Sequence, residues 1–266
     1  MLSRLAAVAA FAWAGTGGAL AQTSIPLVNP GFEADHAPAG GFPVLLPSGW
    51  SLYDPGGIVD QGNNAVGVVN PTGSTFFIDP VPEGSNAALI YLEQRAGTTA
   101  IGDPVGLQQS FATVLQAHTR YTLSASVGNI ASGTGLGAFS GLGFYDLSGF
   151  PGYRLELLAG GQVIAVDDNS LAGTLGEGRF ATATVQFTAG ADHALLGSVL
   201  GVRVVNLNAT GNTFERGREV DFDQIQLFAA AVPEPRDYAM WLAGLGLLYG
   251  LRRKRRQVPV SGVAAH

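Results

Sequence analysis

A period-two alternation of apolar and polar residues is the feature that most constrains how this chain can fold. In residues 121–127, Tyr, Leu, Ala and Val alternate with Thr and Ser, and residues 180–187 repeat the pattern. Successive side chains of a β-strand point to opposite faces, so this pattern predicts strands with one buried and one solvated face. No long segment of residues 22–231 keeps the 3.6-residue period of a helix.

Turn residues between the apolar runs define a hairpin and several more strands. Residues 153–158 and 162–166 flank Gly160-Gly161, a pair suited to the positive φ angles of a tight hairpin turn. The alternation changes parity within the last strand, which predicts a β-bulge near Asp223. Many short strands with Gly, Asn and Asp turns predict an all-β fold, a single β-sandwich of jelly-roll type. The further strands are predicted at residues 88–92, 107–111, 199–207 and 220–228, and residues 55–86 are predicted to be a long surface excursion.

Charge and composition exclude several functions. Residues 22–231 contain seven arginines and 18 acidic residues, a net charge of −11. Binding to nucleic acid or anionic lipid depends on clustered Lys and Arg, so neither is expected of this acidic body. The chain has no cysteine, which excludes disulfides, thiolate metal sites and a cysteine nucleophile. About 210 residues are enough for one domain with a sizeable core.

The N-terminal residues 1–21 have the pattern of a secretory signal peptide. Arg4 precedes an apolar run over residues 5–13, and Ala19-Leu20-Ala21 precedes Gln22. This order matches the charged, apolar and cleavage regions of an export signal. We expect cleavage between Ala21 and Gln22; the alternative is an N-terminal membrane anchor, which the short apolar run disfavours.

The C-terminal residues 232–256 combine Pro233-Glu234-Pro235, an apolar segment over residues 238–251 and five cations over residues 252–256. Fourteen helical residues rise only about 21 Å, less than the roughly 30 Å hydrocarbon core of a bilayer. The order resembles the PEP-CTERM sorting signal of Gram-negative bacteria. The resemblance implies a short transmembrane helix, an exosortase partner and delivery through the envelope to the cell surface or the extracellular space. The tail at 257–266, which runs past the basic cluster, departs from the family's pattern. The alternative is an ordinary single-pass anchor.

The body also carries short motifs of a known sandwich family. The motifs are Leu27-Val28-Asn29-Pro30-Gly31-Phe32-Glu33, Pro47-Ser48-Gly49-Trp50, Leu107-Gln108-Gln109-Ser110-Phe111 and Val220-Asp221-Phe222-Asp223-Gln224-Ile225. They are similar to galactose-binding-like sandwiches of carbohydrate-binding modules. The resemblance implies a structural calcium that joins the opening segment to the last strand, with Glu33 and Asp223 as its carboxylate ligands. Calcium takes six to eight oxygen ligands. The alternative is that both carboxylates are merely solvated.

Candidate ligand contacts lie in the Gly-rich residues 129–152. Phe139, Phe144 and Tyr145 are aromatic residues that can stack on sugar rings, or that cap the open end of the core. Neither HExxH nor G-x-S-x-G occurs, so no catalytic residue is assigned and no cofactor beyond the calcium is expected. We therefore predict an exported, non-catalytic surface or matrix protein that binds polysaccharide. The alternatives are a purely structural matrix protein and a carbohydrate-active hydrolase.

Overall fold

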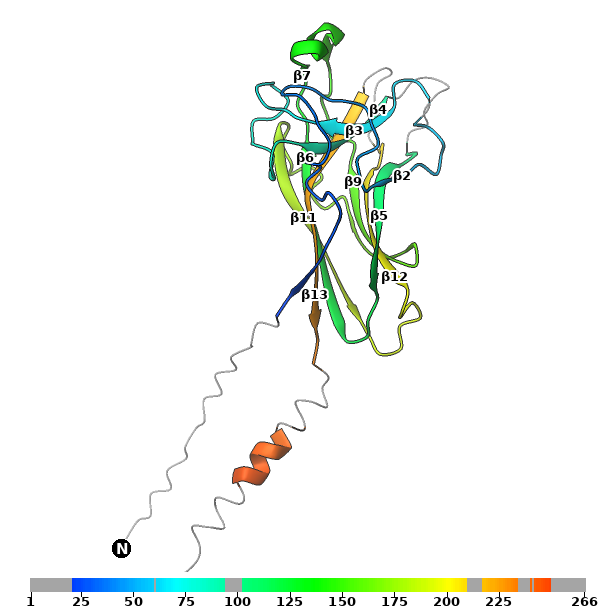
Figure 1. Cartoon of the computed structure of the whole chain (residues 1–266), viewed down its shortest axis with the longest axis vertical. Coiled ribbons are helices and arrows are strands. Elements are labelled where there is room, and N and C mark those ends of the chain that lie inside the picture. Colours follow the sequence, from blue (N-terminus) through cyan, green and yellow to red (C-terminus); the bar gives the residue numbers. More distant parts are fainter. Residues whose placement is uncertain are drawn as a thin grey trace, which may run out of the picture.

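Two antiparallel sheets packed face to face form the body of the protein (Figure 1). The computed structural model describes residues 21–59, 61–93, 102–209, 217–233, 240 and 242–249. The β13 sheet has the order β11 (Arg179–Ala189), β6 (Thr119–Asn129), β13 (Gly217–Ala231), β4 (Ala87–Glu93), β3 (Ala65–Val69), with β1 (Thr23–Ile25) paired to β13. The β12 sheet has the order β10 (Gln162–Asp168), β9 (Tyr153–Ala159), β12 (Val199–Asn206), β5 (Val105–Val114), β2 (Ser51–Tyr53). A two-stranded sheet of β7 (Gly133–Thr134) and β8 (Phe144–Tyr145), with the 3-10 helix η1 (Gly137–Leu142), lies at one end of the sandwich.

The core lies between the two sheets and is built from alternate residues of each strand. Leu123 and Phe222 of the β13 sheet and Leu107 and Leu155 of the β12 sheet are fully buried in one cluster. Removal of these apolar side chains from water supplies the main driving force for the sandwich. The alternate residues of the β13 sheet face away from this core, and that outer face carries the site described below.

The structure confirms the all-β sandwich and most of the predicted strands. β6 and β11 pair without interruption from Thr119 opposite Ala189 to Asn129 opposite Arg179. The predicted hairpin joins β9 to β10, and Gly160 and Gly161 have φ angles of 57° and 77°. The predicted bulge is also present.

The bulge lies in β13, where the pairing with β6 shifts between Asp223 and Gln226. Gln224 has a φ angle of 49°, in the left-handed region that a bulge residue can adopt. The prediction of a continuous surface excursion over residues 55–86 was wrong, because these residues include β3. All five residues of β3 are buried. A strand covered on both faces loses the polar alternation that identifies a half-exposed strand.

The terminal predictions lie largely outside the described residues. Residues 1–20 of the predicted signal peptide, Glu234, Pro235 and the basic cluster lie outside the described residues. Ala21 and Gln22 are exposed just before β1, and Pro233 follows β13. Residues 242–249 are helical. The described part of the chain contains no helix with the length and hydropathy needed to cross a bilayer, and the predicted transmembrane helix over residues 238–251 lies partly outside the described residues.

Candidate functional site: an aromatic cavity with a buried carboxyl pair

A cavity of about 470 Å³ lies on the outer face of the β13 sheet. Its floor consists of residues that alternate with core residues along the strands: Val69 of β3, Leu89 and Tyr91 of β4, and Glu219 of β13. The residues next to them in sequence point to the opposite face of the sheet and belong to the core cluster, so each strand contributes both to the cavity floor and to the core. The floor of the cavity is therefore as rigid as the sandwich itself.

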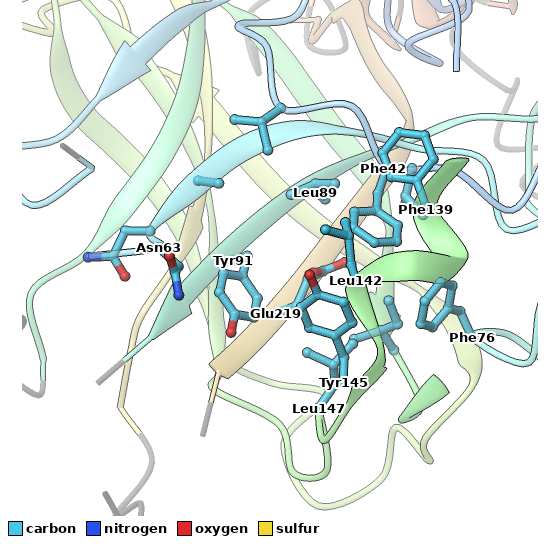
Figure 2. A pocket seen from close by; sticks show the side chains of 15 residues that line it. Phe42, Asn63, Phe76, Leu89, Tyr91, Phe139, Leu142, Tyr145, Leu147 and Glu219 are labelled. Carbon is cyan, nitrogen blue, oxygen red and sulfur yellow. The ribbon is translucent and has the colours of Figure 1, made fainter. Parts of the chain in front are cut away.

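Aromatic side chains from the covering loops form the roof of the cavity (Figure 2). Phe42 lies at their centre, with ring centroids 4.8 Å from Phe139, 5.5 Å from Tyr145 and 5.9 Å from Phe76. The tilted and edge-to-face angles of these pairs are those that aromatic rings prefer. A backbone hydrogen bond of 2.9 Å from Leu136 to the carbonyl of Gly40 fixes the segment before η1 to the loop that carries Phe42.

Three acidic residues stand in a row on the outer face of β13. Glu219, Asp221 and Asp223 alternate with the core residues Val220 and Phe222. β13 is an interior strand between β4 and β6, and all three acidic residues are buried. Only Glu219 of the three lines the cavity. An acidic side chain on the covered face of an interior strand requires a specific reason, because burial of an unpaired charge is costly.

Burial gives the first two carboxyls an unusual affinity for protons. It raises the pKa of Glu219 to about 7, and the neighbouring Asp221 carboxyl opposes part of that rise. Burial and the adjacent Glu219 raise the pKa of Asp221 well above its ordinary value. The two carboxyls interact with each other, and neither buried Asp221 oxygen has a further hydrogen-bond partner in the described structure. Both carboxyls are thus biased towards the protonated form, and Glu219 presents its proton to the cavity.

Two tyrosines flank Glu219. Tyr91 lies opposite Glu219 in the pairing of β4 with β13 and meets Tyr145 edge-on, with centroids 6.5 Å apart. Burial, followed by the charges of Glu219 and Glu93, raises the pKa of Tyr145, so its hydroxyl stays protonated. None of the described residues that line the cavity is a Lys, Arg or His. The site therefore suits a neutral or cationic ligand, since anionic groups are normally bound by Arg or Lys.

The predicted contact residues divide between cavity and solvent. Phe139 of η1 and Tyr145 of β8 line the cavity, whereas Phe144 is 71% exposed and does not. Adjacent residues of a strand face opposite ways, which separates Phe144 from Tyr145. The rings do not cap the core between the sheets; they cover an outer face. Whether they contact a ligand stays a prediction.

Glu33 and Asp223, the predicted calcium ligands, meet at one loop. Glu33 Oε1 accepts backbone N–H groups of Ser85 at 2.7 Å and Asn86 at 2.6 Å, and Asp223 Oδ2 accepts that of Glu83 at 2.7 Å. Burial raises the pKa of Asp223 to about 7; its backbone hydrogen bonds lower the pKa, whereas the charges of Glu83 and Glu33 raise it. Asp223 is therefore not a merely solvated carboxylate. Among the described residues, no group of three or more acidic, His or Cys side chains is arranged to hold a metal.

Sequence reasoning missed Glu219, Tyr91, Phe42 and Phe76. One available signal was the alternation of Glu219, Asp221 and Asp223 with apolar residues in a strand that pairs on both sides. The aromatic residues gave no signal, because their meeting depends on how distant loops fold over the sheet.

Comparisons with known proteins agree on one family. The model of the HpiC1-like family, described as HpiC1 cyclase, matches residues 23–228. A search of curated proteins found no match. The Stig cyclase Fisc from Fischerella sp. TAU, solved with (3Z)-3-(1-methyl-2-pyrrolidinylidene)-3H-indole, is 35% identical with a TM-score of 0.65, and the match covers 80% of this chain and 100% of that one. A cyclase from Fischerella sp. TAU in complex with 4-(1H-indol-3-yl)butan-2-one is also 35% identical, with the same coverage and a TM-score of 0.66.

These matches correct the functional predictions made from sequence. The identification as a PEP-CTERM exported protein with a carbohydrate-binding-module body was wrong, since the body matches a cyclase family. The expectation of a non-catalytic matrix protein, and its structural and hydrolase alternatives, was wrong for the same reason. Exosortase and polysaccharide as partners have no support. The xylan-binding domain of Paenibacillus barcinonensis Xyn10C is only 14% identical, with a TM-score of 0.38, and carries no functional argument.

The short motifs misled because none of their residues lines the cavity, and a scaffold does not by itself determine function. The family model covers more than three quarters of the sequence, and the matches to the 35%-identical structures cover 80% of it. The chain belongs to the HpiC1-like cyclase family.

Proposed function

We propose that this protein is a cyclase that starts ring closure by protonating a neutral, apolar, indole-bearing substrate. The observation that carries the proposal is Glu219, a carboxyl with its pKa raised to about 7 in the wall of an aromatic cavity. A general acid works best when its pKa is near the operating pH. The indole ligands in the Fischerella cyclase structures support the substrate class.

The proposed reaction needs only proton transfer. Glu219 donates its proton to an unsaturated carbon of the bound substrate, which leaves a cation on the substrate and a carboxylate on the protein. A carbon–carbon double bond of the same molecule attacks the cation and closes the ring. The new cation then loses a proton to the Glu219 carboxylate. The product is an isomer of the substrate, and no oxidant or reductant is consumed.

The cavity walls suit such a cation. The rings of Phe42, Tyr91, Phe139 and Tyr145 present electron-rich faces, and a cation over an aromatic face is stabilised by about 0.5–2 kcal/mol. These apolar walls also exclude water, which would otherwise capture the cation. With no Lys or Arg among the described lining residues, departure of a diphosphate is disfavoured as the ionising step.

Reaction in D₂O tests this function. The full chain is incubated with a synthetic indole that carries an unsaturated side chain, and the products are followed by mass spectrometry. We expect a cyclised isomer that contains one solvent deuterium at the protonated carbon. Binding without any cyclised product, across indoles with alkenyl side chains, would contradict the proposal.

We also propose a structural calcium held by Glu33 and Asp223. Both carboxylates approach the loop of residues 83–86, where they could act as two ligands of one ion, and the charge of Glu83 raises the pKa of Asp223. None of these three carboxylates forms an ion pair with a described residue. The remaining oxygen ligands would come from backbone carbonyls and water, as is usual for calcium. The ion would join the opening segment to β13 and neutralise the buried Asp223.

Removal of calcium is expected to lower the melting temperature. In the full chain, a chelator should lower the midpoint of thermal unfolding by several degrees, since a bound ion stabilises only the folded state. Glu33→Gln should abolish the difference between chelator and added calcium. Asp79→Asn, which changes a carboxylate paired with Arg179, is the control and should keep the calcium effect. The same calcium dependence in Glu33→Gln would move the ion elsewhere.

Two finer sequence predictions stay proposals. Successive strands β4, β5 and β6 pass from one sheet to the other and back, which supports a sandwich of the jelly-roll, galactose-binding-like type. Export of the chain, with residues 1–21 as the signal and 22–231 as one domain, rests on the sequence alone.

A further inference from the structure

Gly217 lies under the ring of Tyr91. A Cβ atom added at position 217 would overlap Tyr91 Oη and the ring carbons Cε2 and Cζ. Non-bonded atoms cannot overlap in this way, so a side chain at position 217 and the present position of Tyr91 exclude each other. In Figure 2 the hydroxyl end of Tyr91 points towards the first residues of β13.

The backbone of Gly217 does not itself require glycine. Gly217 is the first residue of β13 and pairs with Glu93 of β4, and it is not among the residues with a positive φ angle. Glycine in a strand weakens it relative to alanine, and it often marks a place where another group approaches closely. Here the approaching group is the Tyr91 ring, a wall of the cavity.

Gly217 and Glu219 lie two residues apart and therefore on the same face of β13. Tyr91, opposite Glu219, leans diagonally along the strand onto Gly217. In this position the Tyr91 ring meets that of Tyr145 edge-on, with the two centroids 6.5 Å apart, and both rings line the cavity together with Glu219. A side chain at position 217 would push the Tyr91 ring off the sheet, on the side where the cavity lies.

We propose that Gly217 is a specificity-determining residue, which holds Tyr91 against β13 and so keeps room for a fused bicyclic ring beside Glu219. The inference rests on the proposed function for the class of substrate. It adds that Gly217, which does not itself line the cavity, determines the width of the cavity at Glu219. Any larger residue at position 217 restricts the site to narrower substrates.

A double-mutant cycle on the full chain tests the proposal. The probe is 4-(1H-indol-3-yl)butan-2-one, with dissociation constants measured by calorimetry. Gly217→Ala is expected to weaken binding at least tenfold. In a Tyr91→Ala background, where no ring can be displaced, the same substitution is expected to change binding less than twofold, because coupling between contacting residues is lost when one is removed. An equal loss in both backgrounds overturns the proposal.

Gly190→Ala is the matched control. Gly190 also has no positive φ angle, and nothing lies within 4 Å of a Cβ added there. This variant should bind the probe as the wild type does. If Gly217→Ala fails to fold, the comparison of Gly217→Ala/Tyr91→Ala with Tyr91→Ala still decides: equal binding supports the proposal, and weaker binding in the double variant overturns it.

A crystal structure of Gly217→Ala separates this inference from the proposed function. We expect the Tyr91 ring to be turned into the cavity, a result that needs no ligand. A ring in its wild-type position overturns the proposal. If the wild type does not bind the indole probe, the proposed substrate class fails, and the position of the ring still decides the role of Gly217.

Discussion

Replacing Glu219 with glutamine is expected to lower the cyclisation rate about 10²–10⁴-fold, the usual contribution of a general acid. Glutamine has nearly the same shape but no proton to donate at neutral pH, so substrate binding should change little. The measurement is single-turnover product formation at saturating substrate. Asp192→Asn removes an exposed carboxylate on the loop between β11 and β12 and should keep wild-type activity. Full activity of Glu219→Gln would show that another group supplies the proton.

The pH dependence of the wild-type cyclisation rate is a second test of Glu219 as the general acid. Because burial raises the pKa of Glu219 to about 7, the protonated form prevails below that pH and is lost above it. The rate should therefore be constant on the acidic side and fall about tenfold for each pH unit well above 7. A rate that rises with pH would indicate a general base instead.

The second large effect concerns stability. The carboxyl of Glu219 has an ordinary pKa of 4.5, which burial raises to about 7 in the folded protein. Between these two pH values the folded state holds a proton that the unfolded state has lost, so the free energy of unfolding falls as pH rises. For one fully buried group the loss is on the order of 3 kcal/mol, complete above the folded-state pKa. Asp221 contributes in the same direction.

Glu219→Gln should remove this loss. Urea denaturation of wild type and variant at pH 5 and pH 8 gives the comparison, with calcium present throughout. From pH 5 to pH 8 we expect the unfolding free energy of the wild type to fall by more than that of Glu219→Gln. At pH 8 the inactive variant is therefore expected to be the more stable of the two proteins. An unchanged difference would mean that Glu219 is not buried as a carboxylic acid.

The strands and turns of the sandwich could be predicted because each depends on residues close together in the sequence. The alternation over residues 121–127 specifies which side of β6 faces the core, and Gly160-Gly161 specifies the hairpin. The parity change near Asp223 even located the bulge. β3 escaped detection because a strand covered on both faces shows no alternation.

The cavity could be predicted only in fragments. Phe139 and Tyr145 were candidates because aromatic residues are unusual in a Gly-rich segment, and both line the cavity. Their partner Phe42 comes from a loop about 100 residues earlier in the chain, and no local pattern records that meeting. The same limit explains the wrong function. Aromatic residues in a Gly-rich segment are compatible with sugar binding and with other apolar ligands. The buried acid beside them can be recognised only when it is known which face of β13 is covered.

Because the cavity lies on the outer face of the β13 sheet, substitutions in its floor and substitutions in its roof have different consequences for the fold. The acid and Tyr91 stand on strands whose opposite side is the core, so a shift of the backbone there would disturb the packing between the sheets. Phe42 and Phe139 belong to loops and to η1, where exchange of one side chain for another leaves both sheets untouched. A lineage can therefore vary the shape of the chamber while its proton source stays in place. Libraries restricted to the roof should yield new ring systems from one unchanged acid.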